Sequence, residues 1–274
     1  MKTLFLHFTL VFVFSINITN AQKGNSINYL DHLPKSLNLD KTILRSYQMT
    51  TDYYNYDLKS KFDGKQRLTG TITFGLQGDS AQWKDVYLAE SKVLDAVFTQ
   101  GEKQEFLQNF KFQSNEKVIT TEFFKDLPEA NTLIKNLFWD MLGFDVFAYS
   151  YWDSLKLNEE FQAKEINSEV TIADIGTFEN RDIRITWLGI TEMNNEICAI
   201  LKYSAMNNPL NIELENMSLS GRSHYWGEVY VSLSDKQIEF ASLMEDVLTD
   251  VKIKGQSNNI LGYTVRTIKL ERIK

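Results

Sequence analysis

The sequence predicts a mainly β protein of the β-rich α+β class: a large curled antiparallel meander with a helical insert near 127–157 covering one face. Apolar and polar residues alternate with a period of two over most of the chain after residue 40, as in strands with one buried face. Short polar turns join these stretches, and a tight turn connects only antiparallel neighbours. One stretch in the middle of the chain has helical spacing instead.

The first elements in this pattern are two predicted strand pairs. Residues 68–76 alternate Leu, Gly, Ile and Phe with polar neighbours, and Gly78-Asp79-Ser80 supplies a turn into a returning strand over 83–89. A second pair is predicted over 106–112 and 118–124, joined across Ser114-Asn115-Glu116.

The predicted helix follows this second pair. Asp126 is the expected N-cap, with Pro128 in the first turn and Glu129 three residues after the cap. Gly143 is expected to end the helix. For 144–157 the pattern leaves two interpretations open, a second helix or a buried aromatic segment. The apolar residues with three- and four-residue spacing are Ile134, Leu137, Phe138, Met141 and Leu142.

From about residue 168 the strand pattern returns. Short polar turns are predicted at 193–195, 221–223 and 234–236. The three prolines, at 34, 128 and 209, fall at predicted element boundaries. The predicted strands are 183–187, 196–203, 210–214, 224–233, 237–244, 247–253 and 263–273.

The domain organisation follows from these elements. A strongly twisted sheet of this size curls, and its apolar inner face needs a cover, for which the helix is the obvious candidate. We predict one β-rich domain over 22–274, since no Pro/Gly/Ser-rich linker divides it. The alternative is a pair of sub-lobes, 41–125 and 165–274, around the helical insert 126–160.

The first 21 residues have the three parts of a cleavable signal peptide. Lys2 supplies an early positive charge, an apolar run covers 4–16, and small side chains stand at Thr19 and Ala21. The run is shorter than the roughly 20 apolar residues of a membrane-spanning helix, and no cysteine lies near the cleavage site for lipid attachment. We therefore expect a secreted or periplasmic protein that begins near Gln22, is not a lipoprotein and keeps no integral membrane segment. This leader resembles those of secreted and periplasmic proteins of the Bacteroidota.

Composition argues against several partners. The chain has 36 acidic and 29 basic residues, and loss of Lys2 with the leader takes the formal charge from −7 to −8. An acidic chain without a basic run does not favour nucleic acid or an anionic membrane surface. Cys198 is the single cysteine and lies in an apolar run, so we expect a small buried side chain and no intramolecular disulfide.

Motifs for catalysis, metals and cofactors are weak or missing in the sequence. Gly221-Arg222-Ser223-His224-Tyr225 lacks the closing glycine of a nucleophile elbow. Arg222, His224 and Tyr225 also have the residue types that a polysaccharide lyase uses, and they are the only weak catalytic candidates. His32 and His224 are the histidines outside the leader, and neither has a partner at metal-ligand spacing. We expect no metal and no cofactor.

Aromatic clusters are the remaining signal. Rings with an apolar face and a polar tip suit sugars or lipid-like ligands, although ordinary packing also explains such clusters. The candidate ligand-binding residues are Tyr53, Tyr54, Tyr56, Tyr151, Trp152 and Trp226.

These observations support three functional hypotheses. The first is non-enzymatic binding of a lipophilic or glycan ligand, or of an envelope partner, and the element order resembles the lipoprotein- and lipid-carrying half-barrels of bacterial envelopes. The second is a secreted carbohydrate-active enzyme, a hydrolase or a lyase. The third is a structural or assembly component of the envelope. The sequence leaves ligand identity, oligomeric state and catalysis open.

Overall fold

One antiparallel sheet contains all the strands of the residues that the computed structural model describes, 36–114, 118, 120–167, 169–171 and 176–274. These residues belong to the compact unit Pro34–Lys274. The predicted leader, Pro34, His32 and two residues of the predicted 114–116 turn lie outside them. The strands are β1 Arg45–Asp57, β2 Phe62–Leu76, β3 Ser80–Ser91, β4 Glu102–Lys103, β5 Phe110–Gln113, β6 Glu160–Gln162, β7 Glu169–Thr171, β8 Gly176–Glu179, β9 Arg184–Met193, β10 Glu196–Leu214, β11 Met217–Ser232, β12 Ile238–Ile253 and β13 Ile260–Ile273.

The strand order confirms the predicted meander. Hydrogen-bonded neighbours run β4-β3-β2-β1-β13-β12-β11-β10-β8-β7, with β5 on β3, β9 on β10 and β6 on β9. The first long strand pairs with the last one, from Ser46 opposite Ile273 to Asp57 opposite Gly262. The two strand-rich stretches of the sequence therefore form one continuous sheet.

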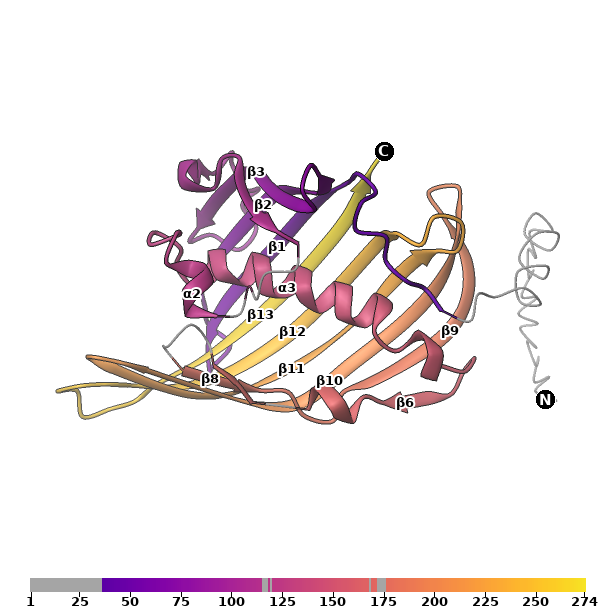
Figure 1. Cartoon of the computed structure of the whole chain (residues 1–274). Helices are drawn as coiled ribbons and strands as arrows, with labels where there is room; N and C mark the ends of the chain where they lie inside the picture. The colour runs from indigo at the N-terminus through magenta and orange to yellow at the C-terminus, as the bar shows by residue number, and fades with distance from the viewer. Residues whose placement is uncertain (1–35, 115–117, 119, 168, 172–175) are drawn as a thin grey trace, which may run out of the picture. The chain divides into compact units, whose positions relative to one another are not determined.

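Helix α3 (Thr132–Tyr149) lies across the inner, concave face of this sheet, and the short α2 (Thr121–Phe124) precedes it (Figure 1). The predicted cover is thus confirmed, but its predicted ends are wrong. Asn131, not Asp126, caps α3, since its Oδ1 accepts from Ile134 N at 3.0 Å. The helix also continues through Gly143, because apolar contacts with the sheet outweigh the glycine. Its buried side chains are Ile134, Leu137, Phe138, Met141, Phe144, Phe147 and Ala148.

The strand pair predicted over 106–112 and 118–124 is wrong. Only β5 forms in the first segment, and it pairs with β3, with Phe110 opposite Trp83. The end of the second segment is α2, whose N-cap Thr120 accepts from Phe123 N at 3.4 Å. Periodicity cannot separate a strand from a helical turn in so short an apolar run, and the cap decides for the helix.

The turn predicted at 221–223 and the boundary predicted at Pro209 are also wrong. Pro209 lies inside β10, just after a register shift between Ala205 and Asn208, where a bulge accommodates it. Gly221 lies inside β11, where a Cβ would stand 2.6 Å from Leu248 O. This glycine therefore serves a close approach of strands and not a turn. The chain reverses instead between Leu214 and Met217.

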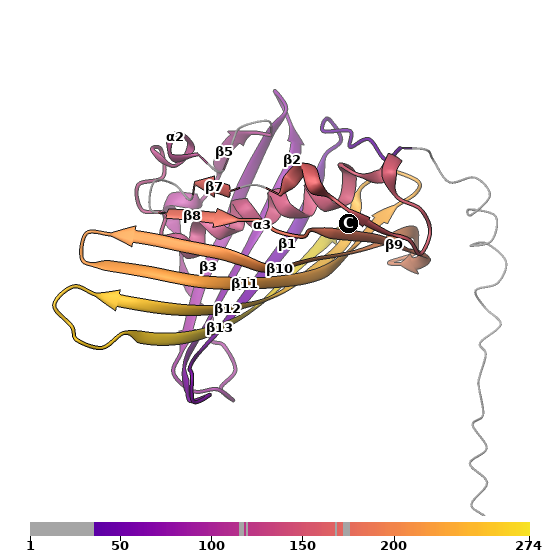
Figure 2. The same cartoon turned by 90° about the horizontal axis from the view of Figure 1, so that it is seen from below.

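Other predictions hold. The turn at Met193-Asn194-Asn195 joins β9 to β10, and both asparagines have positive φ, as a tight hairpin requires. The segments 237–244 and 247–253, predicted as two strands, are instead one continuous strand, β12. The tips of the β10–β11 and β12–β13 hairpins project beyond the rest of the sheet (Figure 2). No helix among the described residues is long and apolar enough to cross a membrane.

Candidate functional site

Contacts with α3 define the two faces of the sheet. Asn136 of α3 donates to the hydroxyl of Tyr53 on β1 at 3.1 Å, and Asp140 of α3 pairs with Arg266 on β13 at 2.5 Å. Glu245 on β12 also binds Arg266. These sheet residues face inward, toward the helix. Because successive side chains of a strand point to opposite faces, their immediate neighbours face outward.

Six apolar or aromatic side chains lie on the outer face of four adjacent strands. Tyr56 stands opposite Tyr263 with ring centroids 6.2 Å apart, and Tyr263 stands opposite Leu248. Met244 stands opposite Trp226. The set spans four adjacent strands, about 14 Å across and about 13 Å along the strands. We call it the outer aromatic face: Tyr54 and Tyr56 on β1, Tyr263 on β13, Met244 and Leu248 on β12, and Trp226 on β11.

The outer aromatic face is accessible. Met244 is 43% exposed and Leu248 45% exposed, whereas the four aromatic residues are half-buried. Phe62 supports one end through an edge contact with Tyr56, at a centroid distance of 5.7 Å. Rings and aliphatic side chains thus share one surface, fixed on the hydrogen-bonded centre of a sheet and not on a loop.

Polar groups lie within and beside this surface. The Tyr263 hydroxyl donates to Asp246 Oδ1 at 3.0 Å, and burial, followed by this carboxylate, raises the pKa of Tyr263. His224 Nδ1 accepts from Asn207 N at 3.1 Å, which leaves Nε2 as the donor nitrogen of a neutral ring. Arg222 is exposed and donates to the neighbouring Gly221 O at 3.1 Å. The surface can therefore combine apolar contact with a few directed hydrogen bonds.

The structure separates the three weak catalytic candidates. Arg222 and His224 face outward, whereas Tyr225 faces inward and donates to Asn180 Oδ1 at 2.8 Å. Ser223 is buried on the inner face and donates to Glu245 Oε1 at 2.5 Å. A serine and a histidine on opposite faces of a sheet cannot form a nucleophile–base pair.

The six candidate ligand-binding residues occupy three places. Tyr54, Tyr56 and Trp226 belong to the outer aromatic face. Tyr53 is buried beneath α3, where the guanidinium of Arg266 lies 5.1 Å from its ring centroid. Tyr151 and Trp152 follow α3 and contact Phe161 and Trp187, at centroid distances of 5.6 Å each. These last two pack against β6 and β9, far along the sheet from the others.

Aromatic side chains of the protein occupy the space between α3 and the sheet. Phe138 of α3 is 2% exposed and contacts Trp83, Phe110 and Phe112, at centroid distances of 5.5–6.1 Å. Nearer the C-terminal end of α3, Phe147 stacks on Tyr203 at 4.0 Å. Where these rings pack, the helix and sheet contact each other directly, and no room is left there for a ligand.

A buried ion-pair cluster fixes α3 over the sheet. Arg266 is 9% exposed and binds two carboxylates, Asp140 on the helix and Glu245 on β12. Burial raises the pKa of Asp140 to about 6, with a further contribution from Glu245 and an opposing one from Arg266. Because its members come from α3, β12 and β13, this ion-pair cluster is a structural link between helix and sheet.

The described part of the chain offers neither a cluster of metal ligands nor a reactive thiol. There, no group of three or more His, Cys, Asp or Glu side chains is placed to hold a metal ion. Cys198 is fully buried, and burial raises the pKa of its thiol to about 12, so the reactive thiolate is disfavoured.

Sequence reasoning missed half of the outer aromatic face. Tyr263, Met244 and Leu248 lie in strands that the pattern predicted, but alternation alone does not say which face is covered. The pairing of β1 with β13 brings Tyr56 and Tyr263 together across more than 200 residues of sequence, and no local signal encodes that pairing.

Comparisons with known proteins add little. No family model and no curated protein matches the chain. A solved structure described as "Lipid-protein interactions in lipovitellin" aligns at 12% identity and a TM-score of 0.38, over 84% of this chain and 25% of lipovitellin. A DUF1329 family protein from Desulfovibrio piger aligns at 8% identity and a TM-score of 0.12, over 89% of each chain. Both TM-scores are low, so we draw nothing about this chain from either structure.

Proposed function

We propose that this chain is an exported, non-enzymatic binding protein whose outer aromatic face binds a protein partner in the cell envelope. The observation that carries the proposal is the gathering of Tyr, Trp, Met and Leu side chains from four strands on one accessible surface. Aromatic residues, Met and Arg are enriched in the buried centres of protein interfaces, where a few side chains supply most of the binding energy. The predicted leader supports a location outside the cytoplasm.

The aliphatic side chains favour a protein over a glycan. A sugar ring gains most from the flat faces of Tyr and Trp, whereas Met244 and Leu248 offer exposed apolar area that another apolar surface would cover. The face also carries Asp246, and Asp52 lies beside it in a bidentate pair with Arg67, at 2.6 Å for each hydrogen bond. Carboxylates at this surface disfavour an anionic membrane as the occupant.

The interior supports the same proposal. The first hypothesis from the sequence included a lipophilic ligand held between curved sheet and helix. The rings of Phe138 and Phe147 fill that space where they pack against the sheet, so the accessible outer side is the better candidate. The outer aromatic face covers about 200 Å². A stable interface buries roughly 800 Å² on each partner, so the surrounding polar surface must supply the rest of the contact area.

Site-specific photo-crosslinking in the producing cells tests this proposal. A photoreactive amino acid at Met244 or Leu248 is expected to capture the same protein. The matched control position is Leu142, which is 40% exposed on α3 and lies on the other side of the sheet. Capture should disappear when Trp226→Ala is added. Equal capture from Leu142, or none from Met244 and Leu248, would refute the proposal; a glycan adduct at these positions would reassign the surface to a sugar.

A further inference from the structure

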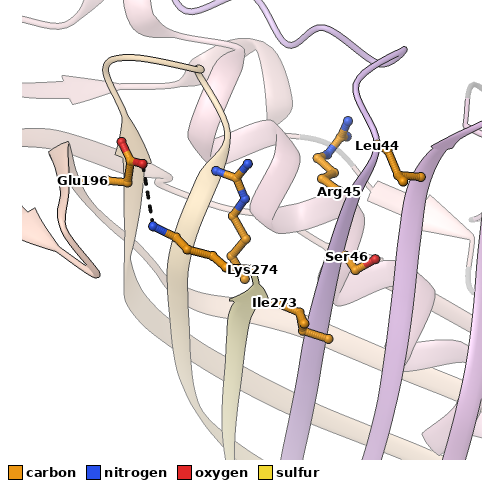
Figure 3. A pocket seen from close by; sticks show the side chains of 7 residues that line it. Leu44, Arg45, Ser46, Glu196, Ile273 and Lys274 are labelled. Carbon is orange, nitrogen blue, oxygen red and sulfur yellow. Dashed lines mark ion pairs between the residues drawn. The ribbon is translucent and has the colours of Figure 1, made fainter.

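A pocket opens at the end of the sheet where β1 begins and β13 ends. It encloses about 400 Å³ and is lined by Arg45, Ser46, Arg272 and Lys274, with Leu44, Glu196 and Ile273 completing its wall. Figure 3 shows Arg45 and Lys274 on neighbouring strands, with Lys274 extended toward Glu196. Three of the seven lining side chains are cations and only one is an anion. None of them belongs to the outer aromatic face.

Arg45 is the first unusual group in this pocket. It is 4% exposed, its guanidinium lies over the Phe74 ring at 4.5 Å, and no carboxylate of the described residues lies within ion-pair distance of it, Asp145 on α3 interacting with it only at longer range. Its hydrogen bond is a long one, from Nη1 to Asp40 O at 3.4 Å. A buried guanidinium with five N–H donors and one weak acceptor is costly unless another acceptor is supplied.

Arg272 leaves donors available on the other side of the pocket. Asp235 and Glu239 both pair with the same nitrogen, Nη1, at 2.6 and 2.5 Å. The other two nitrogens, Nη2 and Nε, therefore keep their N–H groups for a further acceptor. Lys274 donates to Asn194 O at 2.7 Å and forms two long ion pairs, 3.6 Å to Glu196 and 3.6 Å to Glu239. Its ammonium could add an anion by exchanging one of the long pairs.

A buried tyrosine, outside the pocket lining, interacts electrostatically with both arginines. Tyr47 follows Arg45 on the inner face of β1 and lies directly opposite Arg272 across the β1–β13 ladder. It is 1% exposed, and its hydroxyl has no hydrogen-bond partner among the described residues. An unsatisfied buried hydroxyl costs about 1–3 kcal/mol, so this end of the sheet carries a polar group that the described residues leave unsatisfied.

We propose that this end pocket binds an oxyanion, the phosphate or carboxylate group of a small molecule or a lipid head group, between Arg45, Arg272 and Lys274. Guanidinium groups match two oxygens of such a group at once, which makes the contact directional as well as electrostatic. Four acids lie near these cations: Asp235 and Glu239 pair with Arg272, Glu196 and Glu239 form the long pairs with Lys274, and Asp145 on α3 interacts electrostatically with Arg45. A bound anion would therefore use the N–H groups of Arg45 and Arg272 that these carboxylates leave unpaired.

Titration of the full chain with inorganic phosphate, glycerol phosphate and acetate, followed by NMR shifts and calorimetry, tests the proposal. At least one anion should bind at millimolar concentration or below. Arg45→Gln should weaken that binding about 10-fold or more, since it removes charge-assisted hydrogen bonds. Lys274→Gln, at a half-exposed position, should weaken it several-fold without risk to the fold. Lys202→Gln on β10, an exposed lysine away from the pocket, is the matched control and should have no effect.

Binding to lipid vesicles distinguishes the two sources of the anion, a free phosphate ester and a lipid head group. Glycerol phosphate binding without binding to phosphatidylglycerol vesicles assigns the pocket to a free phosphate ester, whereas binding to both assigns it to a lipid head group. The proposal is overturned if none of the three soluble anions binds, or if Lys202→Gln weakens binding as much as Lys274→Gln does.

Discussion

Asp145 makes the stability of the protein depend on pH. It lies on α3, has no hydrogen bond or ion pair with another described residue, and burial raises its pKa to about 6, although Arg45 and Lys41 oppose the shift. An acid whose pKa is higher in the folded state binds more protons there, so the free energy of unfolding falls as pH rises from about 4 to about 6. The contribution lost is on the order of 2–3 kcal/mol.

Asp145→Asn removes this titration. The variant is expected to gain stability relative to the unmodified protein as pH rises from about 4 to 7, because an amide never has to ionise in the buried site. Urea unfolding at several pH values measures the difference. Asp153→Asn, at an exposed position, is the control and should show a constant offset. A difference for Asp145→Asn that does not change with pH would contradict the assignment.

Gly227 tests packing at a single backbone position. A Cβ there would overlap Ser242 O and the hydroxyl of Tyr203, which itself donates to Ser242 O at 2.8 Å. Gly227→Ala is expected to destabilise the protein by about 3 kcal/mol or more, since neither backbone nor buried ring can move freely. Gly143→Ala, in the middle of α3, should stabilise by about 0.5–1 kcal/mol, since the new Cβ would meet only the Phe147 ring, at an ordinary contact distance of 3.9 Å. Thermal unfolding of both variants measures whether Gly227→Ala lowers the stability and Gly143→Ala raises it.

At the scale of elements, the contact between α3 and the sheet depends on Phe138. Its ring touches aromatic side chains on β3, β5 and α2. Phe138→Ala should therefore cost about 3–5 kcal/mol of unfolding free energy. Leu142→Ala, one turn later and 40% exposed, should cost less than about 1 kcal/mol. Equal losses in chemical denaturation would mean that α3 is not held by this aromatic cluster.

The elements also show what local sequence signals can resolve. Alternation predicted β2, β3 and most of the later strands, because one side of each is buried. The turn at Asn194-Asn195 was predictable since asparagine tolerates positive φ. Pro209 and Gly221 misled the prediction, because residues typical of turns were used for a bulge and for a close approach of strands. The end of α3 was missed because tertiary contacts of Phe144 and Phe147 override Gly143.

At the scale of the whole molecule, the pairing of β1 with β13 decides the architecture. It joins two strand-rich stretches into one open sheet and creates the outer aromatic face from residues at both ends of the chain. Tyr54, Tyr56 and Trp226 were predicted as ligand-binding residues from their clustering. Tyr53 was included with them because the sequence does not show that it lies on the opposite face. The end pocket was not predicted, since Arg45 and Arg272 become neighbours only through this pairing.

The central claim is that the outer aromatic face is the binding surface. The most direct test is the affinity of the purified crosslinked partner for variants of this face. Trp226→Ala and Leu248→Ala should each weaken binding by about 2 kcal/mol, roughly 30-fold, whereas Leu142→Ala on α3 should leave the affinity unchanged. Unchanged affinity for both outer-face variants, or an equal loss with Leu142→Ala, would contradict the claim.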